Sequence, residues 1–164
     1  MGKKKKIQNQ PDLITASRML SGTPAFPTSK KVLESDKTVF NYVVCDNEFE
    51  YGFARFLDKS GDVNAFAKLP TQFGFCIQYT DTLANIRNYF PDFIARLANG
   101  SHWIIETKGR EDIDVKLKDN AAISWCAHAT ELTGTHWKYM KVLQKEFETL
   151  HPEDFAELQT AIHQ

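Results

Sequence analysis

The feature that most restricts the fold of this chain is a pair of largely apolar runs, residues 89–97 and residues 102–108, separated by a short region that contains Asn-Gly. Each run has the length and residue types of a β-strand, and so short a connection predicts an antiparallel hairpin. The first run carries Asp92, and the second carries Glu106 and Lys108. Because burying a charge is costly unless it is paired or holds a metal ion, these three side chains need a chemical reason to be there.

The length of the hairpin loop decides whether the two acids face each other. Glu106 and Lys108 are two residues apart on one strand, so their side chains lie on the same face. A loop made of residues 98–100, with its glycine in the left-handed conformation, places Asp92 opposite Glu106. A two-residue Asn-Gly loop would instead set Asp92 against Thr107 and send the two acids to opposite faces of the sheet.

With the longer loop, Asp92 and Glu106 would lie about 5 Å apart at their Cβ atoms, where like charges destabilise a sheet. Their repulsion would be about 3 kcal/mol at an effective dielectric constant of 20. A divalent cation between them removes that cost, and oxygen ligands suit Mg²⁺ or Mn²⁺ better than zinc. We therefore interpret both acids as metal ligands and Lys108 as a group that orients or deprotonates a water, or stabilises charge on a phosphate. The competing interpretation is a turn at Pro91-Asp92 and an exposed ion pair at the end of the second strand.

The rest of the sequence predicts one α/β domain in which helices flank a small mixed sheet. Residues 1–37, rich in Lys, Ser, Thr and Pro, predict a flexible tail or connector, and residues 38–164 the domain itself. Periodicity and turn residues predict a helix over about residues 47–58, strands over 62–70 and 73–79, a helix over 115–132, a strand over 134–144 and a helix over 152–162.

Several stretches of the chain carry a family resemblance. Asp92 of "PDF" and the residues Glu106, Thr107 and Lys108 of "ETK" match the PD-(D/E)xK nuclease pattern. The longer stretches "YFPDFIA", "IIETKGREDIDVKLKDNAAISWC" and "TGTHWKYMKVLQKEFETL" resemble the C-terminal endonuclease domain of the helicase-nuclease subunit of type III restriction enzymes. The resemblance begins near "EFEYGFARFLD", covers roughly two thirds of the chain, and implies a restriction-endonuclease-like mixed sheet flanked by helices.

The resemblance implies hydrolysis of DNA phosphodiester bonds with Mg²⁺, for which Mn²⁺ would substitute. It implies Asp92 and Glu106 as ligands, the carbonyl oxygen of Thr107 as another, and Lys108 beside the attacking water. An acid from the first helix often assists in such nucleases, and Glu50 matches that place better than its neighbour two residues earlier.

The resemblance also implies partners, namely DNA, a helicase domain and a methyltransferase subunit of a restriction complex. No GxxxxGK[ST] phosphate loop occurs in the sequence, so we expect no ATP site and interpret the chain as a nuclease domain without its motor. It is either a fragment or a free-standing relative. Cutting both strands requires two active sites, which makes a dimer plausible.

Basic residues near the second acid are the candidates for contact with nucleic acid. Arg110, Lys116 and Lys118 are placed to touch the DNA backbone, although a solvated helix face explains the two lysines equally well. The net charge of -1 counts weakly against a passive binder that relies on a basic surface. The three cysteines are odd in number and too far apart for a CxxC zinc pair. We therefore interpret them as reduced thiols and expect a cytoplasmic protein.

Two alternatives remain open from the sequence. One is a non-catalytic nucleic-acid-binding or protein-interaction module of the same fold. The other is a nuclease that acts on RNA with the same chemistry, because nothing in the sequence reports on the 2′-hydroxyl.

Overall fold

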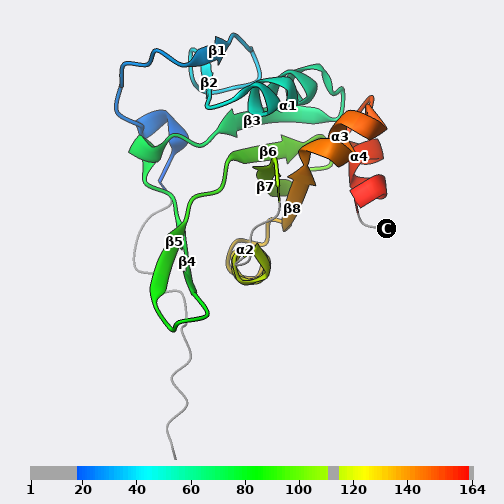
Figure 1. Ribbon diagram of the computed structural model, residues 1–164. Coiled ribbons are helices and arrows are strands. Elements are labelled where there is room, and N and C mark those ends of the chain that lie inside the picture. Colours follow the sequence, from blue (N-terminus) through cyan, green and yellow to red (C-terminus); the bar gives the residue numbers. More distant parts are fainter. Residues whose placement is uncertain (1–17, 111–114, 163–164) are drawn as a thin grey trace, which may run out of the picture.

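A mixed four-stranded sheet forms the centre of the computed structural model, which describes residues 18–110 and 115–162 (Figure 1). The strands lie in the order β3, β6, β7, β8; β3, β6 and β7 are antiparallel neighbours, and β8 runs parallel to β7. Their bounds are Val63–Lys68 for β3, Phe93–Leu97 for β6, His102–Lys108 for β7 and Trp137–Leu143 for β8. A mixed sheet flanked by helices confirms the expected α/β class.

The helices cover the two faces of this sheet. Helix α1 (Glu48–Lys59) lies over one face, and α2 (Val115–Thr133), which makes the crossover between the parallel strands β7 and β8, lies on the other (Figure 1). Helices α3 (Gln144–Leu150) and α4 (Phe155–Ile162) add to the core on the α1 side. The expected helices over residues 47–58 and 115–132 are therefore confirmed.

Helix α1 is stabilised by a capped N-terminus and by an apolar face that packs on the sheet. Asn47 is the N-cap, and its side-chain oxygen accepts a hydrogen bond from the backbone N–H of Glu50 at 2.8 Å. Phe53 and Leu57, one turn apart, are fully buried against the sheet. The cap and the buried face fix where Glu50 emerges, in the first turn of the helix.

The opposite face of the sheet holds a smaller apolar cluster. Ala122 of α2 packs there with Ile77 and Tyr89, and Trp125 lies at its edge. The apolar residues of α2 are buried in part only, because α2 packs on β8 and β4 rather than across a whole sheet. Leu132, near the end of α2, is 44% exposed.

The register of the β6–β7 hairpin places Asp92 and Glu106 opposite each other. Phe93 pairs with Ile105, and the backbone N–H of Leu97 donates to the carbonyl of Ser101 at 2.9 Å. Gly100 has φ of +84°, the left-handed conformation expected at the end of the loop. Continuing this register by one pair sets Asp92 opposite Glu106, as the longer loop predicted.

The run over residues 89–97 is not one strand, as the sequence suggested, but two. Strand β5 (Ile86–Tyr89) pairs with β4 (Ile77–Thr80), and this hairpin projects away from the central sheet (Figure 1). The β-structure is then interrupted at Pro91, which has no N–H to donate to a neighbouring strand, and β6 starts two residues later.

Part of the segment expected to be a tail also has structure. Strand β1 (Lys31–Leu33) pairs with β2 (Val43–Cys45), and the 3-10 turn η1 (Leu20–Gly22) precedes them. A second 3-10 turn, η2 (Thr71–Phe73), follows β3. Residues 1–17 of the expected tail lie outside the described residues. Within residues 18–110 and 115–162, no helix has the length and apolar character needed to cross a bilayer.

Candidate active site

Asp92 lies at the bend directly before β6, and two neighbouring strands hold its carboxylate. One oxygen, Oδ2, accepts hydrogen bonds from the backbone N–H and the hydroxyl of Thr107, each at 2.8 Å. The other oxygen, Oδ1, lies 3.0 Å from the ammonium of Lys68 on β3. The carboxylate is therefore fixed between β7 and β3 at the edge where β6 begins.

Glu106 lies on β7 with only 6% of its surface exposed. Its Oε2 accepts a hydrogen bond from the hydroxyl of Tyr89 at 2.9 Å, and its Oε1 lies 2.9 Å from the ammonium of Lys108. Burial raises the pKa of Glu106, and the charge of Asp92 raises it further, whereas Lys108 and Tyr89 lower it. The two acids are therefore close enough to repel each other.

The structure brings Lys108 and Glu106 into direct contact on one face of β7, as their spacing predicted. Lys108 is partly exposed at the end of the strand, so its ammonium reaches both the buried carboxylate and solvent. Thr107 binds Asp92 through its N–H. Because the N–H and C=O of a strand residue point toward the same neighbouring strand, the carbonyl of Thr107 also faces the start of β6.

Glu50 is part of the same group of acids. It is 5% exposed, and its Oε2 accepts a hydrogen bond from the backbone N–H of Asp46 at 2.7 Å. Burial raises the pKa of Glu50, and the charge of Asp92 is among the nearby charges that act on it. Glu48, by contrast, is exposed and pairs with Lys31 at 2.7 Å. Of the two acids, Glu50 points inward and Glu48 points to solvent, which agrees with the preference for Glu50.

Lys68, which joins Glu50 to Asp92, was not predicted as a site residue. Its only sequence signal is a charged residue that ends the apolar strand "VNAFAK" directly before Leu-Pro. Tyr89, which binds Glu106, was also overlooked, because a tyrosine in an apolar strand usually packs in a core. Neither role is visible without the contacts between strands.

The residues expected to contact nucleic acid lie near β7 or on α2. Arg110 is exposed two residues after Lys108, Lys116 is exposed and Lys118 is partly buried. Their contact with nucleic acid stays a prediction.

The donor set of the site fits a hard divalent cation. Asp92, Glu106 and the Thr107 carbonyl offer oxygen ligands. Burial and then the charge of Asp92 raise the pKa of Glu106, and a bound cation would offset the repulsion between the two acids. Within residues 18–110 and 115–162, no group of three or more His, Cys, Asp or Glu is arranged to hold a metal ion. Mg²⁺ does not require such a cage, because it keeps several waters and takes one or two carboxylates together with substrate phosphates.

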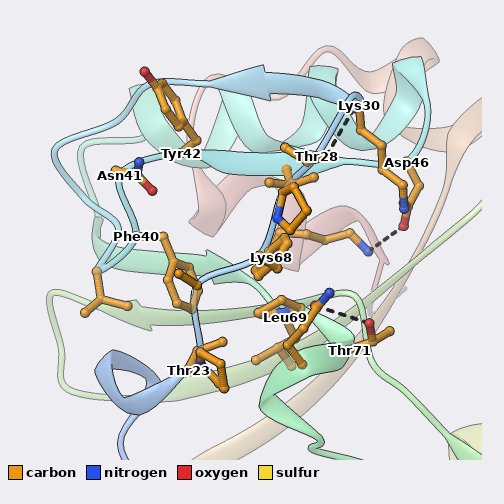
Figure 2. Close-up of a pocket in the computed structure, with 18 of the residues that line it drawn as sticks. Thr23, Thr28, Lys30, Phe40, Asn41, Tyr42, Asp46, Lys68, Leu69 and Thr71 are labelled. Atoms are coloured by element: carbon orange, nitrogen blue, oxygen red, sulfur yellow. Dashed lines mark hydrogen bonds and ion pairs between the residues drawn. The ribbon is translucent and has the colours of Figure 1, made fainter.

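A cavity of about 810 Å³ adjoins Asp92 and Lys68. Asp92, Lys68 and Asp46 line it together with residues 23–28 and 39–42. Figure 2 shows the side chain of Lys68 crossing the cavity floor with its ammonium directed at Asp46. The described part of the predicted tail therefore forms one wall of the space beside the candidate site.

Comparison with known proteins agrees with this geometry. Residues 36–148 match a protein family described as an endonuclease domain. No curated protein and no solved structure matches the chain. The matched range runs from β2 to α3 and includes Glu50, Asp92, Glu106 and Lys108. Since it covers more than half of the sequence, the chain belongs to this endonuclease domain family.

Proposed function

We propose that this domain hydrolyses DNA phosphodiester bonds with Mg²⁺, as part of a type III restriction system or a related helicase-nuclease. The observation that carries the proposal is the placement of Asp92, directly before β6, opposite Glu106 of β7 when the β6–β7 register is continued by one pair, with Lys108 bonded to Glu106. Membership of the endonuclease domain family supports nuclease activity in general. The metal, the choice of DNA and the restriction context are our proposal.

Each residue of the centre has a distinct task. Asp92, Glu106 and the carbonyl of Thr107 hold the ion, which, when bound, supplies positive charge that acidifies a water and stabilises a phosphate. The Thr107 N–H and the Tyr89 hydroxyl keep the two carboxylates in place. Lys108, at the border between the buried carboxylate and solvent, orients the attacking water and stabilises the charge that develops on the phosphate. Glu50, on α1, lies 3.4 Å from the ammonium of Lys68.

Contact with the substrate is proposed to extend beyond the metal. Arg110 and the two lysines of α2, Lys116 and Lys118, would neutralise backbone phosphates and so position the strand. Because the chain has no ATP-binding loop, a helicase domain and a methyltransferase subunit would supply movement and recognition. Double-strand cutting would require a second copy of the site.

The test compares cutting of plasmid DNA, single-stranded DNA and RNA by the wild type with cutting by Asp92→Asn and Lys108→Met. General acid–base and metal-site losses reach about 10²–10⁴-fold, so we expect cutting to fall at least about 100-fold in each variant. Circular dichroism and thermal melting establish that the variants fold. Glu131→Gln, an exposed acid on α2, is the matched control and should cut at the wild-type rate.

Three results would argue against the proposal. Undiminished cutting by Asp92→Asn would remove the site assignment. Selective cutting of RNA would mean that the substrate is RNA and not DNA. A wild type that binds DNA without cutting, with an affinity that Asp92→Asn does not change, would favour a non-catalytic binding module of the same fold.

A further inference from the structure

We propose that Lys68 is the fixed cation of the candidate site. Its ammonium occupies the place of a second metal ion between α1 and β6, so the site takes up one divalent ion, at Asp92 and Glu106, and Glu50 does not coordinate it. This inference rests on the proposed function, because it concerns the same acids.

Three carboxylates surround the ammonium of Lys68. Its Nζ lies 3.0 Å from Asp92 Oδ1, 3.4 Å from Glu50 Oε1 and 3.5 Å from Asp46 Oδ2. These acids come from three separate places in the chain: the bend before β6, the first turn of α1 and the end of β2. A cation at their meeting point is what makes burial of Glu50 and Asp92 side by side tolerable.

Lys68 is held in this position from several sides. The residue is 9% exposed, and Nζ lies 5.6 Å from the centre of the Phe93 ring, to which it is paired across β3 and β6. If the ammonium left, Glu50 would lose the cation nearest to its buried carboxylate, and the contacts of Asp92 within residues 18–110 and 115–162 would be reduced to its bonds with Thr107. An uncompensated buried charge is strongly destabilising, so the side chain stays.

Asp92 then has the position of a carboxylate shared by two cations. Its Oδ1 faces Lys68, and the charge of the same carboxylate acts on Glu106. Metal ions in two-metal sites are about 3.5–4 Å apart and share a carboxylate in this way. An ion between Glu50 and Asp92 would have to displace the ammonium, because two cations cannot occupy one place. Lys68 therefore limits the number of ions, and Glu50 acts by holding Lys68.

The first test counts Mn²⁺ ions by isothermal titration calorimetry, without nucleic acid. The wild type should bind one ion. Lys68→Met, which keeps the length and the apolar stem but removes the charge, should bind two, because the vacated position is surrounded by carboxylates. Lys68→Arg, which restores the charge, should again bind one. A wild type that binds two ions, or a folded Lys68→Met variant that binds only one, would overturn the proposal.

The double variant Lys68→Met/Glu106→Gln separates this inference from the proposed function. It should bind one ion, at the vacated Lys68 position, whereas Glu106→Gln alone should bind none. A wild type that binds no Mn²⁺ would contradict the proposed metal site, and one ion bound by the double variant would still support the role of Lys68. No ion bound by a folded double variant would count against it.

A second variant keeps the inference testable if Lys68→Met does not fold. Glu50→Gln keeps the shape of the side chain and should change the affinity for Mn²⁺ by less than the roughly 10-fold that loss of ligand support causes. The matched control is Glu48→Gln, an exposed acid two residues earlier on the same helix. A tenfold or larger loss in Glu50→Gln, with Glu48→Gln unchanged, would show that Glu50 is a ligand and that the inference is wrong.

Discussion

At the scale of single residues, Glu106 combines deep burial with a second carboxylate nearby. Because burial and Asp92 together outweigh Lys108 and Tyr89, the pKa of Glu106 is raised above its usual value of 4.5. The folded protein therefore binds this proton more tightly than the unfolded chain does. Stability that depends on the proton is fully present below the unfolded pKa and is lost as pH rises through the folded pKa.

Because the raised pKa of Glu106 lowers the stability of the folded protein at neutral pH, we predict that Glu106→Gln is more stable than the wild type at pH 7 in the absence of divalent ions. The substitution removes a charge that the surroundings disfavour and keeps the size of the side chain. Each 1 kcal/mol gained moves the melting temperature by about 2–4 °C for a domain of this size, and the gain should shrink as pH falls toward 4. Thermal melting over a pH series measures it, and cutting should be lost in the same variant.

Two controls belong to that measurement. Millimolar Mn²⁺ should raise the melting temperature of the wild type by mass action and leave Glu106→Gln unchanged. Glu131→Gln, on the exposed face of α2, should melt with the wild type at every pH. A Glu106→Gln variant that melts below the wild type at pH 7 would mean that the contacts with Lys108 and Tyr89 outweigh the cost of burial.

The residues of the candidate site differ in whether the sequence alone predicts their positions. That Asp92, Glu106 and Lys108 lie together was predictable, because two of them are on one strand and the position of the third is set by the length of a single loop. The role of Lys68 was not predictable, since its ammonium meets acids directly after β2, in α1 and at the bend before β6. No pattern within one segment reports a contact that requires four segments to be packed.

At the scale of elements, strand β7 and helix α1 were predicted closely, because each is long enough to show its period. Strands β1, β2 and β5 have three or four residues each and were not predicted. A strand so short has no alternation to detect and is held by its partner. Helix α3 was overlooked for a related reason, since it follows β8 without any turn residue between them.

The β6–β7 turn gives the prediction at this scale. Gly100 has φ of +84°, and no heavy atom lies within 4 Å of the Cβ that an alanine would add, so the cost of Gly100→Ala is conformational only. The left-handed conformation disfavours a side chain by about 1–2 kcal/mol, which should lower the melting temperature by several degrees. Cutting per folded molecule should persist, because the register is kept.

Gly52→Ala is the matched control for the turn. Gly52 lies inside α1, again with no atom within 4 Å of the added Cβ, so the same substitution should stabilise the protein by about 0.5–1 kcal/mol. Opposite signs for the two variants would confirm that backbone conformation decides the effect. A Gly100→Ala variant as stable as the wild type would mean that the loop adopts another conformation and that the pairing of Asp92 with Glu106 needs revision.

At the scale of the whole molecule, the range shared with the endonuclease domain family is smaller than the packed unit. Residues 36–148 leave out β1, which pairs with β2, and α4. Phe155 and Leu158 of α4 are fully buried, and the ring of Phe155 packs edge-on against Trp103 of β7. The strand that carries Glu106 therefore depends on a helix outside the matched range.

Helix α4 is also attached through its first turn. Asp62, in the turn before β3, accepts hydrogen bonds from the backbone N–H groups of Phe155 and Ala156, at 3.1 and 2.8 Å. This carboxylate caps the N-terminus of a helix more than ninety residues away in the chain. The contact ties the end of the sequence to the edge strand that carries Lys68.

These contacts predict that truncation after residue 150 destabilises the whole domain and not the C-terminus alone. Two fully buried side chains contribute about 1.5–3 kcal/mol each, so the free energy of unfolding should fall by about 3–6 kcal/mol, and Phe155→Ala in the full chain should lose about 3–5 kcal/mol. Urea denaturation followed by the fluorescence of Trp103 and its neighbours measures both. Thr160→Ala, on the exposed side of α4, should stay within about 0.5 kcal/mol of the wild type. A truncated protein with the full unfolding midpoint would mean that α4 is an appendage and that residues 36–148 fold by themselves.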